Sequence, residues 1–262
     1  KRLYNYFKFL FIINIHLKKM KAKNLYKSFL YKAAHPFKNK FQCPICGYHG
    51  PFIDYTWQCF SEHYCCPRCF SAARHRLQYL TIKQLSKNYD FINKVLLHFA
   101  PESCLQAFLR QTFGAYYTSD ISAKGVDCIA DLCHLPFKSK SCDVIFASHV
   151  LEHIYDDLSV LNEIWRILKS GGIAILPVPI FGPVTIEYPQ RNPDEYDHVR
   201  APGLDYFKRY KEFFLEVQII SSNDFPEKYQ TYLYEDREHW PDTMPLRPKT
   251  KGKKHADFVP VC

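Results

Sequence analysis

The sequence lacks any apolar run close to the roughly 20 residues that a membrane-spanning helix needs, so we expect no transmembrane segment. The apolar stretch 9–15 is short, lies between Lys8 and Lys18, and lacks the small-residue cleavage site of a signal peptide. These absences favour a cytoplasmic protein. Hydrophobic residues still make up 47% of the 262 residues, which is enough for one α/β domain and a small module.

Acidic residues are absent from the first 40 positions, which carry 11 Lys and Arg. The other 222 residues hold 24 basic and 26 acidic side chains, so the net charge of +9 comes from this basic arm. A broad positive surface for nucleic acid is therefore absent from the body of the protein. We interpret the arm, 1–40, as a solvated and partly disordered tail. Contact with phosphate, RNA or an anionic membrane surface is the alternative.

The chain also begins without methionine, and Met20 is the first one. The region before it is rich in Lys, Asn, Ile, Phe and Tyr and carries no chemical motif, so we expect the natural protein to start at Met20. Intact-mass analysis of protein from the native host checks this expectation, and a mass that includes residues 1–19 would contradict it.

Cysteine, by contrast, is abundant, with 11 residues of which six lie close together. Cys43 and Cys46 form one C-x2-C pair, and Cys66 and Cys69 form another after 19 intervening residues. This is the spacing of a structural zinc site, because two residues between thiolates allow a tight turn that points both sulfurs at one ion. We predict that these four cysteines bind zinc in a ribbon.

Two disulfides in an exported protein are the alternative, but the odd number of cysteines and the lack of a convincing signal peptide argue against it. Cys59 and Cys65 are not required for the site, since only Cys66 has the two-residue spacing to Cys69. The scattered cysteines are interpreted as core residues; they are Cys104, Cys128, Cys133 and Cys142.

Short apolar runs alternate with helical patterns from residue 95 onward, and several runs end on a polar or acidic residue. Such units predict an α/β fold with a doubly wound, mostly parallel sheet, preceded by the small ribbon. We expect a helix to begin after Asp156 and to end at Gly171-Gly172, and we expect 241–254 to be a loop. The expected strands are 95–99, 115–119, 126–130, 142–147, 173–178, 214–220 and 258–261. The expected units are a basic arm (1–40), a zinc ribbon (41–70), a linking helix (71–94) and the α/β domain (95–262).

Several motifs together carry a family resemblance. They are the run 69–76 after the ribbon, Leu97-His-Phe-Ala-Pro-Glu102, Ala130-Asp-Leu-Cys-His-Leu-Pro-Phe137, Ser148-His-Val-Leu-Glu-His153 and Asp197-His-Val-Arg200. With them, the chain resembles class I S-adenosylmethionine-dependent methyltransferases, and more narrowly a bacterial subgroup with an N-terminal zinc ribbon, over about residues 41–220. Most class I enzymes have a glycine-rich first loop, which lets the backbone approach the cofactor. Here that loop has no glycine, and Ala100 is its one small residue.

The resemblance implies a cofactor site at the carboxyl ends of the parallel strands. Asp120 would bind the ribose hydroxyls, and Asp131 would accept a hydrogen bond from the adenine amine, with Leu132 near the ring. For either acid, a helix N-cap or a turn is the alternative. The residues expected to line the cofactor site are His98, Ala100, Glu102, Asp120, Asp131, Leu132 and Ser148.

Histidines supply the candidate general bases. His149 ends the fourth expected strand and His153 follows one helical turn later, so both can face one cleft. Imidazole titrates near neutral pH and suits proton transfer, although either side chain could be a satisfied structural histidine. A second candidate is His198, which Asp197 could orient.

The long loop 185–200 is predicted to cover a substrate at the carboxyl edge of the sheet. Glu187, Arg191 and Arg200 are the side chains expected to bind the acceptor, Arg200 through a carboxylate or phosphate. A solvated lid with an internal salt bridge is the alternative.

These features predict a methyltransferase that moves a methyl group from S-adenosylmethionine to an oxygen of a small molecule or glycan precursor. An RNA base methyltransferase is the first alternative, and it requires that the ribbon, Arg74, Arg76 and the arm form one positive surface beside the pocket. A zinc-ribbon scaffold that no longer binds the cofactor is the second.

Overall fold

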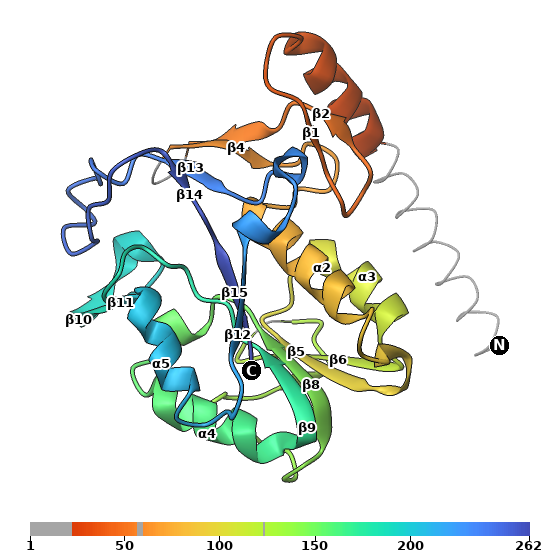
Figure 1. Ribbon diagram of the computed structural model, residues 1–262, viewed down its shortest axis with the longest axis vertical. Helices are drawn as coiled ribbons and strands as arrows, with labels where there is room; N and C mark the ends of the chain where they lie inside the picture. Colours follow the sequence, from red (N-terminus) through yellow and green to blue (C-terminus); the bar gives the residue numbers. More distant parts are fainter. Residues whose placement is uncertain (1–22, 57–59, 123) are drawn as a thin grey trace.

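The computed structural model describes residues 23–56, 60–122 and 124–262. A seven-stranded sheet lies at its centre, in the order β12-β15-β9-β8-β5-β6-β7 (Figure 1). The five strands from β9 to β7 in this order are parallel, whereas β15 is antiparallel to both of its neighbours. The strands are β5 (Val95–Phe99), β6 (Ala115–Asp120), β7 (Cys128–Ile129), β8 (Cys142–Ala147), β9 (Leu168–Ile175), β12 (Gln218–Ser221) and β15 (Phe258–Val261).

Alternate side chains of the central strands enter two separate cores. Leu97 of β5 and Ile145 of β8 point to one face, while Leu96 and Val144 point to the other. Helices cover both faces, as Figure 1 shows, and the predicted doubly wound fold is therefore confirmed. The first face packs against α4 (Asp157–Ile167) and α5 (Phe207–Tyr210), and the second against α2 (Ala73–Leu85) and α3 (Ser103–Thr112).

One predicted helix end is wrong. Helix α4 ends at Ile167 and strand β9 begins at once at Leu168, so Gly171 and Gly172 lie inside the strand. The pairing of β9 with β8 shifts register across this segment, and Gly171 takes φ +71° there. A Cβ on Gly172 would lie 2.9 Å from two carbonyl oxygens. The two glycines therefore allow the irregular pairing of the strand and do not cap a helix.

A four-stranded sheet in the order β14-β13-β4-β3 lies beyond one edge of the central sheet (Figure 1). It joins the ribbon to the carboxyl-terminal part of the chain, because Tyr234 of β13 pairs with Glu62 of β4. The stretch 241–254, which the sequence predicts to be a loop, thus leads into a strand, and β15 returns the chain to the central sheet. The strands are β3 (Ile53–Tyr55), β4 (Ser61–Cys65), β13 (Leu233–Glu235) and β14 (Lys254–His255).

Part of the basic arm is folded. Residues 23–34 are helical, although the sequence predicts a tail there, and the Tyr31 hydroxyl donates to the carbonyl of Phe52 at 3.2 Å. Lys38 forms an ion pair of 2.5 Å with Asp54. The proposed start at Met20 lies outside the described residues. Among the helices in the described part of the chain, none has the length and apolar character to cross a membrane.

The remaining elements are short. Two hairpins are formed by β1 (Phe41–Gln42) with β2 (His49–Gly50) and by β10 (Ile186–Asn192) with β11 (His198–Ala201). The 3-10 turns are η1 (Phe91–Asn93), η2 (Leu151–His153), η3 (Pro193–Glu195), η4 (Leu204–Tyr206), η5 (Ser222–Asp224) and η6 (Glu227–Tyr229).

Candidate metal centre and active site

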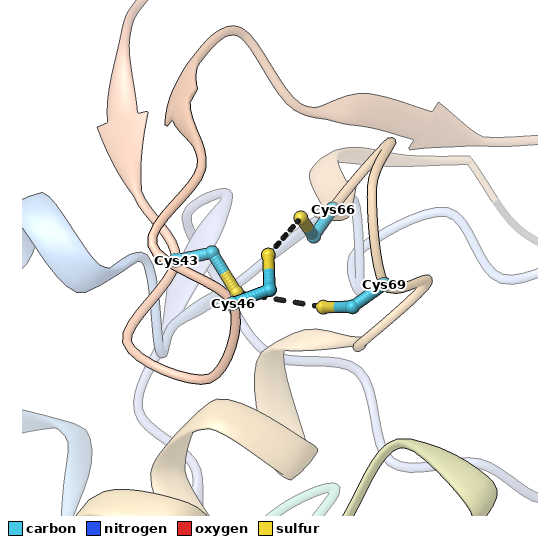
Figure 2. A group of neighbouring side chains, drawn as sticks. All are labelled: Cys43, Cys46, Cys66 and Cys69. Carbon is cyan, nitrogen blue, oxygen red and sulfur yellow. Dashed lines mark hydrogen bonds between the residues drawn. The ribbon is translucent and has the colours of Figure 1, made fainter. Parts of the chain in front are cut away.

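The four predicted zinc ligands converge on one point. In Figure 2 the sulfurs of Cys43, Cys46, Cys66 and Cys69 face one another, and all lie within 4.8 Å. Two of the sulfur–sulfur distances, Cys43 to Cys69 and Cys46 to Cys66, are 3.6 Å. A tetrahedral zinc with bonds of about 2.3 Å would place its sulfurs about 3.8 Å apart. The donor set and its spacing therefore fit a closed, structural zinc site.

The two knuckles that carry these cysteines have the same backbone form. The amide of Gly47 donates to the carbonyl of Cys43, and the amide of Phe70 donates to the carbonyl of Cys66, both at 2.9 Å. The residue after each knuckle is left-handed, with φ +70° at Gly47 and φ +58° at Phe70. Both knuckles therefore need a left-handed residue at this position. The first knuckle has a glycine there, and the second has a phenylalanine.

Cys65 stands apart from this cluster. Its thiol contacts the carbonyl of Cys66 at 3.9 Å, and burial raises its pKa to about 11, so it is protonated at neutral pH. The hydroxyl of Ser71 instead touches the cluster, at 3.5 Å from Cys43 and 3.2 Å from Cys69. Cys59 lies outside the described residues.

The predicted cofactor residues lie at neighbouring strand ends. Phe99 of β5 pairs with Ser119 of β6 and with Ala147 of β8, so the residues that follow these strands meet at one edge of the sheet. Ala100 has φ +47° and its amide donates to the carbonyl of Ser119 at 2.9 Å. This left-handed turn with a minimal side chain is the backbone form that a glycine would give at the first loop.

Asp120 and Asp131 both close local turns, as the alternative interpretation expected. Asp120 Oδ1 accepts from the amide of Ser122, and Asp131 Oδ1 accepts from the amide of Cys133, each at 2.9 Å. These bonds fix the carboxylates at the ends of adjacent strands without excluding a ligand. Leu132, beside Asp131, is buried. The set therefore fits a nucleoside at this edge, with carboxylates held for its hydroxyls and amine.

His98 supports its neighbours from inside the sheet. It is fully buried, and its two ring nitrogens lie 2.9 Å from the Tyr116 hydroxyl and 2.8 Å from Glu102 Oε2. Burial is the largest single influence and would raise the pKa of Glu102, but the hydrogen bond and charge of His98, together with His75 and Ser148, outweigh it and lower that pKa to about 2. Glu102 is therefore a fixed carboxylate at the first loop, with His98 as its positioning residue. Ser148 accepts from Gln78 at 2.8 Å.

A cavity of about 590 Å³ separates the ribbon from the carboxyl edge of the central sheet. The histidines proposed as bases, His149, His153 and His198, all line it, together with Glu152. Asp197 does not line it; this residue is exposed and left-handed, with φ +62°. The four-stranded sheet contributes Ser61, Tyr64, Leu233 and Glu235 to the cavity wall, and Asp257 reaches it from just before β15.

The side chains predicted to bind the acceptor, Glu187, Arg191 and Arg200, take part in contacts that hold the β10–β11 hairpin against η2. Arg200 is buried and donates to the carbonyls of Leu151, Ile154 and Tyr155 at 2.6–2.9 Å. Its Nε also pairs with Glu187 at 2.9 Å. None of these side chains lines the cavity. The contacts match the alternative of an internally bridged lid, and direct contact with an acceptor stays a prediction.

Arg191 has a similar place on the same hairpin. Its Nη1 donates to the carbonyl of His153 at 2.9 Å and to that of Asp197 at 3.3 Å. It therefore links the backbones beside two cavity histidines, His153 and His198.

Sequence reasoning missed several residues that line the cavity. Glu152 belongs to the same motif as His149 and His153, so its chemistry was visible there. Tyr196, whose hydroxyl lies 2.5 Å from that of Tyr55, gives no sequence signal. The same holds for Arg247, Met244 and Asp257, which reach the cavity from the carboxyl-terminal segment.

Comparison with known proteins adds a domain assignment. Residues 100–176, from the end of β5 to the end of β9, match the family model described as "Methyltransferase domain". The match to this domain therefore falls on the centre of the sheet. The match covers the candidate cofactor residues from Ala100 to Ser148 but not the ribbon or the hairpin.

Individual relatives match over limited lengths. The chain is 30% identical over 123 residues to demethylmenaquinone methyltransferase of Clavibacter sepedonicus, which covers 45% of this chain and 41% of the relative. It is 47% identical over 49 residues to an uncharacterized protein of Methanocaldococcus jannaschii, covering 19% and 21%. The chain therefore spans less than half the length of these curated relatives. Among solved structures, geranyl diphosphate C-methyltransferase from Streptomyces coelicolor A3(2) has a TM-score of 0.47 and 12% identity, covering 71% of this chain and 80% of that one.

Proposed function

We propose that this protein is an S-adenosylmethionine-dependent methyltransferase that acts on an oxygen of a small molecule or glycan precursor. The observation that carries the proposal is the position of the 590 Å³ cavity, which lies at the carboxyl edge of the matched domain and is lined by histidines. Cavities of about 300–1,000 Å³ suit compact ligands. S-adenosylmethionine, when bound, supplies a methyl group that is already activated on a sulfonium, and the leaving group is a neutral thioether.

The cofactor would be held at the ends of β5, β6 and β7. In this proposal Asp120 accepts hydrogen bonds from the ribose hydroxyls, and Asp131 accepts one from the adenine amine. The left-handed backbone at Ala100 lets the first loop pass close to the cofactor. Glu102 supplies a fixed negative charge at the first loop for the cationic end of the ligand. In this proposal the methyl group faces the end of β8, where His149 and Glu152 line the cavity.

His149 is the proposed proton acceptor. Its Nδ1 lies 3.3 Å from Oε1 of the buried Glu152, and its Nε2 is available to take a proton from the acceptor hydroxyl. The acceptor oxygen then forms its bond to the methyl carbon as the sulfur–carbon bond breaks. His198 is a weaker candidate, because burial lowers its pKa to about 3.

The ribbon would hold a structural zinc. All four donors are thiolates in a closed set, so no open coordination position remains for a substrate. Its role in this proposal is to shape the cavity wall, since β4 of the ribbon and its pairing partner β13 both contribute side chains to that wall.

The RNA alternative is disfavoured by the arginines on which it depends. Arg76 is fully buried and donates to the carbonyls of Ser71, Tyr64 and Gln230, so it cannot contact phosphate. Arg74 lines the cavity and donates to the Tyr64 hydroxyl at 3.3 Å.

Binding of S-adenosylmethionine to the zinc-loaded protein, measured by calorimetry, tests the proposal. We expect Asp120→Ala to weaken binding at least about tenfold, since it removes charge-assisted bonds to two hydroxyls. Asp242→Ala, an exposed aspartate between β13 and β14, is the matched control and should bind as the wild type does. Absence of binding by folded wild-type protein would favour the scaffold alternative.

His149→Ala separates binding from chemistry. This variant should keep the affinity for S-adenosylmethionine and lose methyl transfer to small molecules extracted from the native host, followed as S-adenosylhomocysteine release. Equal turnover in His149→Ala and the wild type would remove His149 from the mechanism.

A further inference from the structure

Glu152 is a carboxylate buried without adequate partners. Glu152 is 0% exposed, and neither of its carboxylate oxygens accepts a hydrogen bond from any residue that the structure describes. Oε1 lies 3.3 Å from His149 Nδ1 and 3.9 Å from His153 Nε2, but neither contact is a hydrogen bond that could replace lost water. A buried charge of this kind is costly unless a cation or a donor compensates it.

Histidines with unused nitrogens surround this carboxylate. His198 is buried, and its Nδ1 has no hydrogen-bond partner among the residues in 23–56, 60–122 and 124–262. The rings of His153 and His198 meet edge to face, with centroids 4.7 Å apart. One donor atom each from Glu152, His153 and His198 lies within 4.8 Å of the others.

Two imidazoles and one carboxylate are an established donor set for divalent transition metals. Ligand atoms bound at about 2.1 Å from one ion are at most about 4.2 Å apart, so small side-chain rotations would close this group around a metal. The remaining coordination positions would face the cavity, which these three residues line. The four-thiolate cluster is, by contrast, saturated.

Two arginines, Arg200 buried and Arg191 exposed, fix the backbones that carry the three residues. Arg200 binds the carbonyl of Leu151 in η2 and that of Ile154 just after it, and Arg191 bridges the carbonyls of His153 and Asp197. Preorganised support of this kind is what a metal site needs from the residues around its ligands.

We propose that Glu152, His153 and His198 form a second metal site, open to the cavity, for a divalent transition metal such as Zn²⁺ or Fe²⁺. The ligand that completes it is an oxygen donor, and if the proposed function holds, this donor is the acceptor hydroxyl. A metal would lower the pKa of that hydroxyl and ease removal of its proton by His149. The metal site itself does not depend on the methyltransferase proposal, and it is testable without the cofactor.

Cobalt titration tests the site directly, with Co²⁺ as the probe and no S-adenosylmethionine present. Protein whose ribbon is already loaded with zinc should bind one further equivalent of Co²⁺, measured by calorimetry and by metal analysis after gel filtration. Glu152→Gln, which keeps the shape of the side chain, should lower the affinity for this equivalent at least about tenfold, since the loss of even an outer-shell partner of a metal ligand costs about 10–100-fold. The zinc content of the ribbon should not change.

His153→Asn is the second variant, chosen because the His153 side chain is 32% exposed and its replacement does not open a core. It should weaken binding of the further equivalent of Co²⁺, as Glu152→Gln does. His239→Asn is the control, since this histidine is exposed and pairs with Asp236 outside the cavity. The proposal would be overturned if the zinc-loaded wild type bound no further Co²⁺, or if both variants bound it as tightly as the wild type. Either outcome would leave a buried histidine–glutamate ion pair in place of the metal site.

Discussion

His153 and His198 come from separate elements, η2 and β11, yet their rings pack edge to face at 4.7 Å. Arg200, two residues after His198, makes this possible by binding the carbonyls of Leu151, Ile154 and Tyr155. One guanidinium thus ties the hairpin to the turn that carries the cavity histidines. The geometry of the candidate active site depends on an arginine that does not enter the cavity.

Arg200→Lys should therefore lower both stability and activity. Lysine cannot satisfy three carbonyls and a carboxylate in one plane, and we expect a loss of about 2–3 kcal/mol in the free energy of unfolding. Urea denaturation measures this, and Arg110→Lys, at an exposed position, should change it by less than about 0.5 kcal/mol. The affinity for S-adenosylmethionine should not change, because Arg200 ties the hairpin to η2 and is not among the residues proposed to bind the cofactor. Weakened cofactor binding would show a different role.

The sequence predicts the parts of this molecule that rest on local pattern. Runs such as 95–99 and 142–147 are mostly apolar, each with a single polar residue, and they alternate with helical patterns, so the parallel strands and their order along the chain follow from the sequence pattern. The two C-x2-C pairs likewise determine which cysteines converge. Spacing in the sequence is enough where the interacting residues share one short segment or one repeated motif.

The parts that were missed depend on distant pairing. Strands β13 and β14 are only three and two residues long, and nothing in 233–255 indicates that they add to the ribbon strand β4. Arg200 binds main-chain carbonyls around η2, and sequence cannot distinguish such an arginine from one that meets a ligand, so its contact with a substrate stays a prediction. His98 shows the same limit, since its burial between Tyr116 and Glu102 depends on the fold.

Loss of the ribbon metal should disturb the cavity as well as the ribbon. Cys66→Ser removes one of four sulfurs, and because metal-binding energy is folding energy, we expect at least about 3 kcal/mol less stability. Zinc content and thermal unfolding measure the effect. Cys65→Ser, at the neighbouring position, is the matched control and should keep its zinc. Equal zinc loss in the two variants would mean that the ligand assignment is wrong.

Acid should weaken the first loop. The pKa of Glu102 falls from 4.5 to about 2 in the folded protein, so its ionised form stabilises the fold fully above about pH 4.5. That contribution is lost as the pH falls from about 4.5 toward 2. Glu102→Gln should cost on the order of 2 kcal/mol at pH 7, and the difference from the wild type should shrink below pH 4. A difference that stays constant from pH 7 to pH 3 would contradict the ion-pair account of Glu102 and His98.

Ala100 is the residue whose substitution reports most directly on the first loop. Its φ of +47° strains any side chain with a Cβ by about 1 kcal/mol, so Ala100→Gly should relieve this strain, partly offset by the greater freedom of glycine in the unfolded chain. We expect a net change within about 1 kcal/mol and unchanged or tighter binding of S-adenosylmethionine. Ala100→Val should destabilise the fold, because branching at Cβ is least tolerated in a left-handed turn. Urea denaturation measures the stability of both variants, and calorimetry measures their affinity for S-adenosylmethionine. If Ala100→Gly bound the cofactor more weakly than the wild type, the Ala100 methyl group itself would contact the ligand.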